Sequence, residues 1–180
     1  MFKNRNSYKD AAKVLKAGGA CVLPTDTIYG IHCQALNKES VERVYSIKSR
    51  DRSKPFIILI PSIKALKEFG ITFNEKELKR YWPGPISIKF PSDNNGFEYL
   101  HCGKGSLAFR LPKKKSLIKL MKQVGPLIST SVNKEGEPSI SSVVEAQQKF
   151  DGQIDLYVDE GPLDNKPSKL IDLQNTVYRE

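Results

Sequence analysis

Short apolar segments alternate with segments of helical periodicity along the whole sequence, and this alternation limits the folds that the chain can adopt. Buried strands are expected at residues 20–23, 28–31, 56–60, 86–90, 106–111, 126–130, 154–158 and 170–173. Helices are expected at residues 7–18, 37–50, 62–69, 74–81, 117–124 and 142–150. Such alternation predicts an α/β or mixed α+β layer structure, and it argues against a helical bundle or a β-sandwich.

Individual residues mark where several of these elements begin and end. Ser7 and Asn37 are the expected N-caps of the first two helices, because their side-chain oxygens can accept from free backbone N–H groups. Pro24 is expected to end the first strand and to open a polar loop. The prolines and glycine of residues 82–85 predict a turn, and residues 93–105 are expected to form a polar loop.

Length and composition fit one globular domain spanning residues 1–180. With 39% hydrophobic residues, a chain of 180 residues can close a sizeable core. No segment approaches the roughly 18 uncharged apolar residues of a membrane span, and Met1–Asp10 is too polar for a secretory signal. Three cysteines, an odd number, argue against a disulfide framework. We therefore expect a cytoplasmic protein that does not bind membranes.

The chain carries a large positive charge. Its 29 Lys and Arg residues against 20 Asp and Glu residues give a formal net charge of +9. A polyanion or a phosphorylated ligand is a natural partner for such a chain. A solvated lysine surface explains the same excess equally well, so the charge alone does not select a function.

Three polar clusters stand at the ends of expected elements, where loops commonly carry ligands. Lys48, Arg50 and Lys54 lie at or just beyond the C-terminal end of the second expected helix, and their side chains suit the binding of phosphate. Residues 129–133 offer hydroxyl and amide groups, which donate to phosphate or carboxylate oxygens without adding charge. Residues 24–30 add hydroxyls and a carboxylate after the first strand. Each cluster also has a plain structural explanation, as a basic helix end or a polar turn.

Two His-Cys pairs, at residues 32–33 and 101–102, raise the question of a zinc site. Adjacent residues on a strand point to opposite faces, and the two-to-four-residue ligand spacing typical of zinc sites is missing. We therefore expect no zinc. The sequence also contains no Walker A, GxGxxG or GxSxG motif, so any ATP that binds is not held by a P-loop.

Six short motifs occur in order over nearly the whole chain. They are Pro24-Thr25-Asp26-Thr27-Ile28-Tyr29-Gly30, Lys48-x-Arg50 with Lys54-Pro55, Trp82-Pro83-Gly84-Pro85, Ser106-Leu107-Ala108-x-Arg110, Ser129-Thr130-Ser131-x-Asn133 and Pro167-Ser168. Together they resemble the YrdC-like family, and specifically its short single-domain branch, the TsaC threonylcarbamoyl-AMP synthases. The resemblance implies a YrdC-like fold, in which helices flank a twisted mixed β-sheet around a basic concave cavity.

The resemblance also implies a set of site residues. Those assigned to the nucleotide are Lys48, Arg50, Lys54, Ser131, Asn133, Ser141 and Arg179. Those assigned to threonine are Thr27, Arg110 and Ser168. Lys48 and Arg50 are expected to be catalytic, and no protein side chain is expected to ligate a metal.

The activity implied by the resemblance is that of a nucleotidyltransferase. It forms L-threonylcarbamoyladenylate and pyrophosphate from L-threonine, bicarbonate and ATP, for threonylcarbamoyladenosine modification of tRNA. Mg²⁺ is expected to accompany ATP. The expected partners are a threonylcarbamoyl-transferase complex of the TsaD, TsaB and TsaE type, and tRNA or double-stranded RNA.

Two other functions stay open at this point. One is a non-catalytic RNA-binding or ribosome-binding factor, for double-stranded RNA or tRNA, which the net charge and the run Lys113-Lys114-Lys115 favour. The other is a carbamoyl-adenylate enzyme of another pathway, in which a similar domain sits in a much larger chain with acylphosphatase and zinc-finger modules.

The sequence departs from the family pattern at a few positions. Val132 stands where alanine is usual, and its added methyl groups are expected to tighten the pocket. Lys134-Glu135 replace a small residue and a serine, and Ser168-Lys169-Leu170 replace a serine-threonine-valine motif. None of these departures removes a group that is expected to do chemistry.

Overall fold

A computed structural model describes residues 7–179, whose strands form one nine-stranded mixed sheet in the order β7-β1-β2-β6-β3-β5-β4-β8-β9. The strands are β1 Cys21–Pro24, β2 Tyr29–Gln34, β3 Ile57–Leu59, β4 Ile86–Pro91, β5 Ser106–Arg110, β6 Leu127–Ser131, β7 Leu156–Tyr157, β8 Lys169–Asp172 and β9 Val177–Arg179. The pairs β1/β7, β3/β5 and β4/β8 are parallel, and the other neighbours are antiparallel. The mixed sheet predicted from the family resemblance is confirmed.

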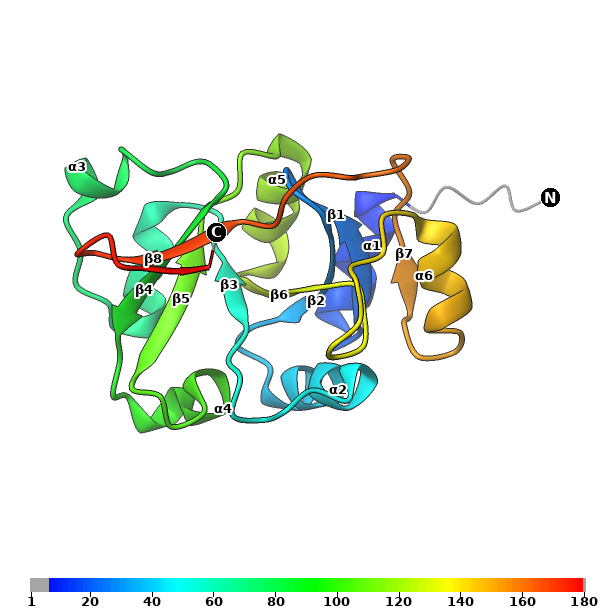
Figure 1. The fold of residues 1–180 in the computed structure, drawn as a ribbon, viewed down its shortest axis with the longest axis horizontal. Coiled ribbons are helices and arrows are strands. Elements are labelled where there is room, and N and C mark those ends of the chain that lie inside the picture. Colours follow the sequence, from blue (N-terminus) through cyan, green and yellow to red (C-terminus); the bar gives the residue numbers. More distant parts are fainter. Residues whose placement is uncertain (1–6, 180) are drawn as a thin grey trace.

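Helices cover both faces of this sheet (Figure 1). The α-helices are α1 Tyr8–Lys16, α2 Lys38–Lys48, α3 Glu75–Leu78, α4 Glu98–His101, α5 Lys115–Val124 and α6 Val143–Lys149, and the 3-10 helices are η1 Ile63–Phe69 and η2 Asn95–Phe97. Ser7 and Asn37 are N-caps, as predicted, and accept from the backbone N–H groups of Asp10 at 3.3 Å and Ser40 at 3.0 Å.

Alternation along the strands divides the core into two clusters. On one face, Leu23 of β1 and Leu127 of β6 pack beneath α1 and α5. On the other face, the larger cluster contains Ile31 of β2, Ile58 of β3 and the buried side of α2. Both clusters contain many residues without exposed surface, so side chains pack tightly on each face of the sheet. The strand ends that border the cavity described below are therefore held rigidly from two sides.

Several elements differ from the sequence prediction. Residues 62–69 form a 3-10 helix that ends at Gly70 with φ of 71°, and the helix expected at 74–81 contains only the four residues of α3. The polar segment 93–105 contains η2 and α4, which were not predicted. The exposed strand β9 was also not predicted, because its three side chains show no alternation of buried and exposed positions.

The segment that joins β7 to β8 crosses the molecule from one end of the sheet to the other (Figure 1, orange to red). Tyr29 holds it by donating its hydroxyl to Gly161 O at 2.7 Å, and Leu163 N donates to Ser141 O at 2.9 Å. This strap delivers Ser168 to the edge of β4, where β8 begins.

Within residues 7–179, no helix combines the length and the apolar character that crossing a membrane requires. The prediction that the polar N-terminus is not a secretory signal concerns mainly residues 1–6, which lie outside the described residues.

Candidate active site

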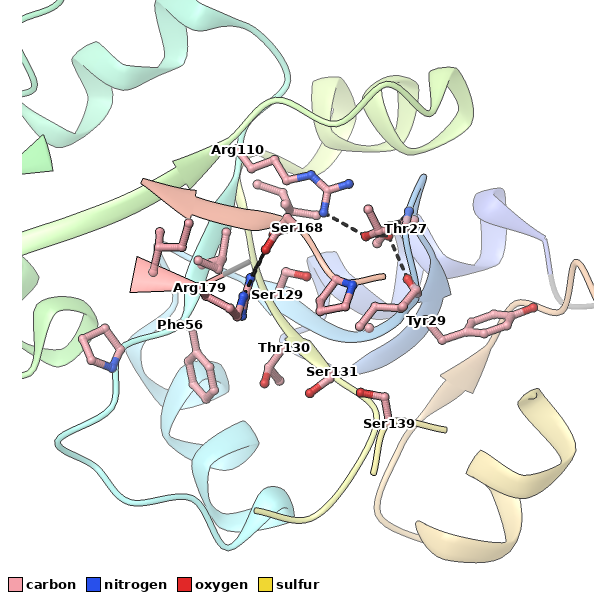
Figure 2. A pocket seen from close by; sticks show the side chains of 18 of the residues that line it. Thr27, Tyr29, Phe56, Arg110, Ser129, Thr130, Ser131, Ser139, Ser168 and Arg179 are labelled. Carbon is pink, nitrogen blue, oxygen red and sulfur yellow. Dashed lines mark hydrogen bonds between the residues drawn. The ribbon is translucent and has the colours of Figure 1, made fainter. Parts of the chain in front are cut away.

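A cavity of about 390 Å³ opens on the α1 and α5 side of the sheet, below the strap (Figure 2). Its size is within the range of small-molecule sites in proteins. It is lined by Thr25, Thr27, Ile28, Tyr29, Gly30, Arg50, Pro55, Phe56, Ile57, Leu59, Arg110, Ser129, Thr130, Ser131, Ser139, Pro167, Ser168, Leu170 and Arg179. The three polar clusters predicted to carry ligands, at residues 24–30, 48–54 and 129–133, all contribute to this lining.

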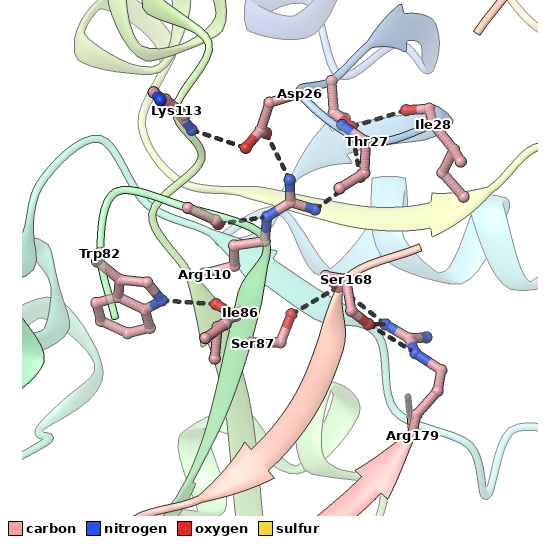
Figure 3. A network of polar contacts seen from close by, with 12 residues as sticks. Asp26, Thr27, Ile28, Trp82, Ile86, Ser87, Arg110, Lys113, Ser168 and Arg179 are labelled. Atoms are coloured by element: carbon pink, nitrogen blue, oxygen red, sulfur yellow. Dashed lines mark hydrogen bonds and ion pairs between the residues drawn. The ribbon is translucent and has the colours of Figure 1, made fainter. Parts of the chain in front are cut away.

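Arg110, the last residue of β5, is held rigidly at one end of the cavity (Figure 3). Its Nε donates to Gly84 O at 3.1 Å, its Nη1 to Thr27 Oγ1 at 3.0 Å and its Nη2 to Asp26 Oδ1 at 2.5 Å. Asp26 also accepts from Lys113 N at 3.0 Å. Burial lowers the pKa of Arg110, and Asp26 partly offsets that effect.

Arg179 of β9 and Ser168 of the strap form a second fixed unit (Figure 3). Arg179 donates to Ser168 O from Nε at 3.0 Å and from Nη2 at 2.7 Å, and to Ser168 Oγ at 2.9 Å. The Ser168 hydroxyl also lies 2.9 Å from the Ser87 hydroxyl of β4. The unpredicted strand β9 therefore brings a cation to the cavity.

Arg50 is the third cation of the lining. It follows the C-cap of α2, Ser49, whose φ of 49° turns the chain sharply toward the cavity. Its guanidinium donates to Lys54 O at 2.9 Å and to Pro55 O at 3.2 Å and lies 5.1 Å from the centre of the Phe56 ring. These contacts hold the guanidinium at the rim while leaving several N–H groups free of protein partners.

Lys48 lies beneath the cavity wall and is not part of the lining. Its ammonium group donates to Ser131 O at 2.6 Å, Asn133 O at 2.7 Å and Asn133 Oδ1 at 2.9 Å. Ser131 Oγ donates to the same Asn133 Oδ1 at 2.6 Å. All three N–H groups of Lys48 are therefore used to hold the end of β6.

The pKa of Lys48 is lowered from 10.5 to about 7 by burial, with the positive charge of Arg50 acting in the same direction. Glu135 and the three acceptor oxygens oppose this shift, because they favour the charged ammonium.

Lys54 and Ser141 also stand outside the lining. The Lys54 ammonium pairs with Glu135, which accepts from Asp51 N at 2.6 Å through its other oxygen. Glu135, a departure from the family pattern, thus neutralises Lys54 and ties its loop to the segment after β6. The expectation that Val132 tightens the pocket is wrong, because Val132 faces the opposite core and has no exposed surface.

The lining has a surplus of positive charge, because it contains three arginines and, among the described residues, no aspartate or glutamate. Burial lowers the pKa of Arg179, and Arg50 lowers it further by repulsion. Repulsion by Arg179 similarly adds to the lowering of the Arg110 pKa by burial. Anions that bind here relieve this repulsion, so the site favours phosphates and carboxylates.

Residues 13–180 match the family described as "Telomere recombination", which groups the Sua5, YciO and YrdC proteins. The chain belongs to the Sua5/YciO/YrdC family. Among its relatives, the "Threonylcarbamoyl-AMP synthase" of Coxiella burnetii (strain RSA 493 / Nine Mile phase I) is 35% identical over 87% of this chain and 86% of the relative. The protein of that name from Pseudomonas fluorescens (strain Pf0-1) is 31% identical over 85% of each chain.

Solved structures of this family have the same fold. Pyrococcus abyssi Sua5 complexed with L-threonine has a TM-score of 0.85 and 29% sequence identity, over 93% of this chain and 51% of that chain. This chain thus spans about half the length of that Sua5 structure. E. coli YciO, at a TM-score of 0.84 and 24% identity over 96% of this chain and 88% of that chain, shows the likeness of fold.

The site residues expected from the family resemblance fall into two groups. Those that line the cavity are Thr27, Arg50, Arg110, Ser131, Ser168 and Arg179. Those that lie behind or beside it are Lys48, Lys54, Asn133 and Ser141. The sequence analysis did not single out Ser129, Ser139 or Leu59 as site residues. Ser129 was inside a quoted motif, whereas no local pattern marks Ser139 or Leu59.

Among the described residues, no group of three or more His, Cys, Asp or Glu side chains could hold a metal ion. In the pair at residues 32–33, Cys33 belongs to the core under α2, and the His32 ring bonds instead to Ile128 O at 3.1 Å. The cavity side chains offer hydroxyl oxygens but no carboxylate among the described residues. This donor set fits an Mg²⁺ ion only as part of MgATP, held by phosphate oxygens and water.

The lowered pKa of the buried Lys48 ammonium should make the stability of the folded protein depend on pH. Between its folded pKa of about 7 and its ordinary value of 10.5, the unfolded chain keeps a proton that the folded protein has lost. The unfolded state then binds more protons, so stability rises with pH in this window. From pH 7 to pH 10, we expect the free energy of unfolding of the wild type to increase relative to that of Lys48→Met.

Urea denaturation of both proteins at several pH values measures this difference. Groups other than Lys48 titrate in both proteins and cancel in the comparison. Parallel curves for the two proteins would show that Lys48 keeps its ordinary pKa and that the network holds it fully charged.

Proposed function

We propose that this chain is a threonylcarbamoyl-AMP synthase, an enzyme of the nucleotidyltransferase class that joins L-threonine, bicarbonate and ATP. The observation that carries the proposal is a cavity with three arginines and, among the described residues, no lining carboxylate, in a chain related to proteins of that name. The substrates and the product all carry phosphate, carboxylate or carbamate groups, which such a cavity suits.

Arg110 and Thr27 form the end of the cavity that suits the amino acid. Three of the five N–H groups of Arg110 are used by Gly84, Thr27 and Asp26. Two remain for the carboxylate of threonine, and a guanidinium and a carboxylate bind with well-defined geometry. Because β5 and the 24–30 loop fix Arg110 from two sides, the carboxylate binds with little further ordering of the protein.

Arg50, Arg179 and Ser131 form the part that suits the nucleotide. Burial and repulsion by Arg50 lower the pKa of Arg179, and phosphate oxygens of ATP would offset that repulsion. Ser131 offers its hydroxyl at the end of β6. Lys48 and Asn133 act on this part from beneath, because their hydrogen bonds set the position of Ser131.

The reaction proposed here has two steps. The amine of threonine attacks the carbon of bicarbonate and gives a carbamate, with loss of water. A carbamate oxygen then attacks the α-phosphorus of ATP, the bond to the β-phosphate breaks, and pyrophosphate leaves. The protein contributes positioning and neutralisation of phosphate charge, and Mg²⁺ enters bound to the ATP phosphates.

The adenylate product is reactive toward water, so a strap over the cavity would protect it until transfer. We propose that a threonylcarbamoyl-transferase complex of the TsaD, TsaB and TsaE type takes the product on to tRNA in the cytoplasm. A direct contact with tRNA is favoured by exposed lysines on α1 and α5, which pack together. These are Lys9, Lys13, Lys16, Lys115, Lys119 and Lys122. Binding through them would weaken steeply with salt.

Omission of single substrates tests the proposed function. We expect pyrophosphate release only when threonine, bicarbonate and ATP are all present, because the nucleophile is a carbamate that needs the first two. Release is measured with a coupled assay in buffer freed of carbon dioxide and then supplemented. Full activity without bicarbonate would contradict the carbamate mechanism.

Two arginine variants should affect different substrates. Arg50→Ala should chiefly lower kcat, because the charge of Arg50 acts as the α-phosphorus is attacked. The expected loss of transition-state stabilisation is about 2–4 kcal/mol. Arg110→Lys should chiefly raise KM for threonine, because lysine keeps the charge but loses the planar fork. We prefer lysine to alanine here, since alanine would leave Asp26 without its partner.

Arg52→Ala is the matched control for this pair, because Arg52 belongs to the same basic segment but pairs with Glu42 and is not in the lining. It should behave as the wild type. Steady-state kinetics with either substrate varied, after melting curves have shown that each variant is folded, separates the effects. Equal changes of kcat and both KM values in the two cavity variants would refute the assignment of Arg50 and Arg110 to different substrates.

A further inference from the structure

The imidazole of His32 is wholly buried, and one of its nitrogens has no partner. Nδ1 lies 3.1 Å from Ile128 O and donates to it, because a carbonyl can only accept. Nε2 is then an unprotonated acceptor, and it has no hydrogen bond among the described residues. An unsatisfied buried acceptor is costly, so one beside a substrate cavity calls for a physical explanation.

Nε2 is aimed at the cavity floor. His32 and Gly30 lie two residues apart on β2 and therefore share a face of the sheet. A Cβ atom added to Gly30 would lie 2.6 Å from Nε2 and 2.9 Å from Cε1 of the ring. Gly30 lines the cavity and His32 does not, so the edge of the ring lies directly behind the floor, at a point where position 30 has no side chain.

Ser129 approaches the same point from the neighbouring strand. It stands opposite His32 in the pairing of β2 with β6, and it lines the cavity. Its Oγ lies 3.2 Å from the same added Cβ position. An acceptor without a donor and a serine hydroxyl therefore lie on either side of one point of the floor.

We propose that His32 is a positioning residue of the amino-acid site, whose Nε2 accepts the proton of the Ser129 hydroxyl. The Ser129 oxygen then presents its lone pairs to the cavity, where they accept a hydrogen bond from the nitrogen of the bound amino acid. Arg110 holds the carboxylate of the same ligand. This inference rests on the proposed function and adds to it the group that orients the nitrogen.

A proton-transfer role for His32 fits the site less well than this acceptor role. Burial lowers the pKa of His32 to about 4; the backbone carbonyls of Ile128 and Leu23 oppose the shift, and the positive charge of Arg110 adds to it. A ring that gained a proton here would be a wholly buried cation repelled by Arg110. The neutral ring instead serves as a fixed acceptor for the Ser129 hydroxyl. The nitrogen of the bound amino acid, held by Ser129, then keeps its lone pair directed toward the bicarbonate carbon.

Three variants test the inference kinetically. Ser129→Ala and His32→Phe should each lower kcat/KM for threonine about tenfold, the value of one hydrogen bond, with KM for ATP unchanged. The double variant should lose no more than either single variant, because the two residues act as a unit. His101→Phe is the matched control, since His101 has the same buried Nε2 without a partner but lies in α4, whereas the His32 ring packs against the lining residue Gly30.

A spectroscopic measurement decides the question even if His32→Phe fails to fold. In protein labelled with ¹⁵N-histidine, the Nε2 resonance of His32 should show an unprotonated nitrogen at pH 7. It should shift when L-threonine saturates the wild type, and it should not shift in Ser129→Ala. Losses that add in the double variant, or an Nε2 resonance that ignores threonine, would overturn the inference while wild-type activity stands. A wild type that releases no pyrophosphate with threonine would instead overturn the proposed function.

Discussion

The hydrogen bonds of the Lys48 ammonium are the interaction on which the rest of the site depends. A buried charge is tolerated only when its donors are satisfied, and Lys48 satisfies all three on Ser131 and Asn133. These bonds join the last residue of α2 to the last residue of β6, two elements that are distant in sequence. Arg50 follows Lys48 by two residues, so the same bonds set where its loop leaves the helix. Lys48 stays behind the cavity wall and holds the end of β6 there. The hydroxyl of Ser131 and the charge of Arg50 can therefore line the cavity.

The cavity concentrates cations that the fold only partly neutralises. Asp26 pairs with Arg110 from outside the lining, and Glu135 is used by Lys54, so Arg50 and Arg179 keep their charge available. A surplus of this kind costs stability in the empty protein and favours anionic substrates. The energetic cost and the proposed function have the same origin: burial and then repulsion by Arg50 lower the pKa of Arg179, and a bound phosphate relieves that repulsion.

Local patterns predict much of this molecule, and long-range contacts account for what they miss. The caps Ser7 and Asn37 and most strands follow from short-range rules of periodicity and capping. The role of Asp26 as partner of Arg110 depends on residues 84 positions apart, and so does not follow from either segment alone. The burial of Lys48 likewise does not follow from the local sequence, because a lysine at a helix end is ordinarily solvated. Strand β9 forms through pairing with β8, which gives its exposed side chains no pattern to detect.

In the proposed reaction, a carbamate oxygen attacks the α-phosphorus of ATP inside this cavity. Bicarbonate labelled with oxygen-18, followed by ³¹P NMR of the products after a single turnover, tests this step. We expect an isotope shift on the phosphorus of the adenylate, because the bridging oxygen comes from bicarbonate, and we expect unlabelled pyrophosphate. Label in pyrophosphate or in inorganic phosphate would contradict it, because the attack would then have occurred at another phosphorus atom.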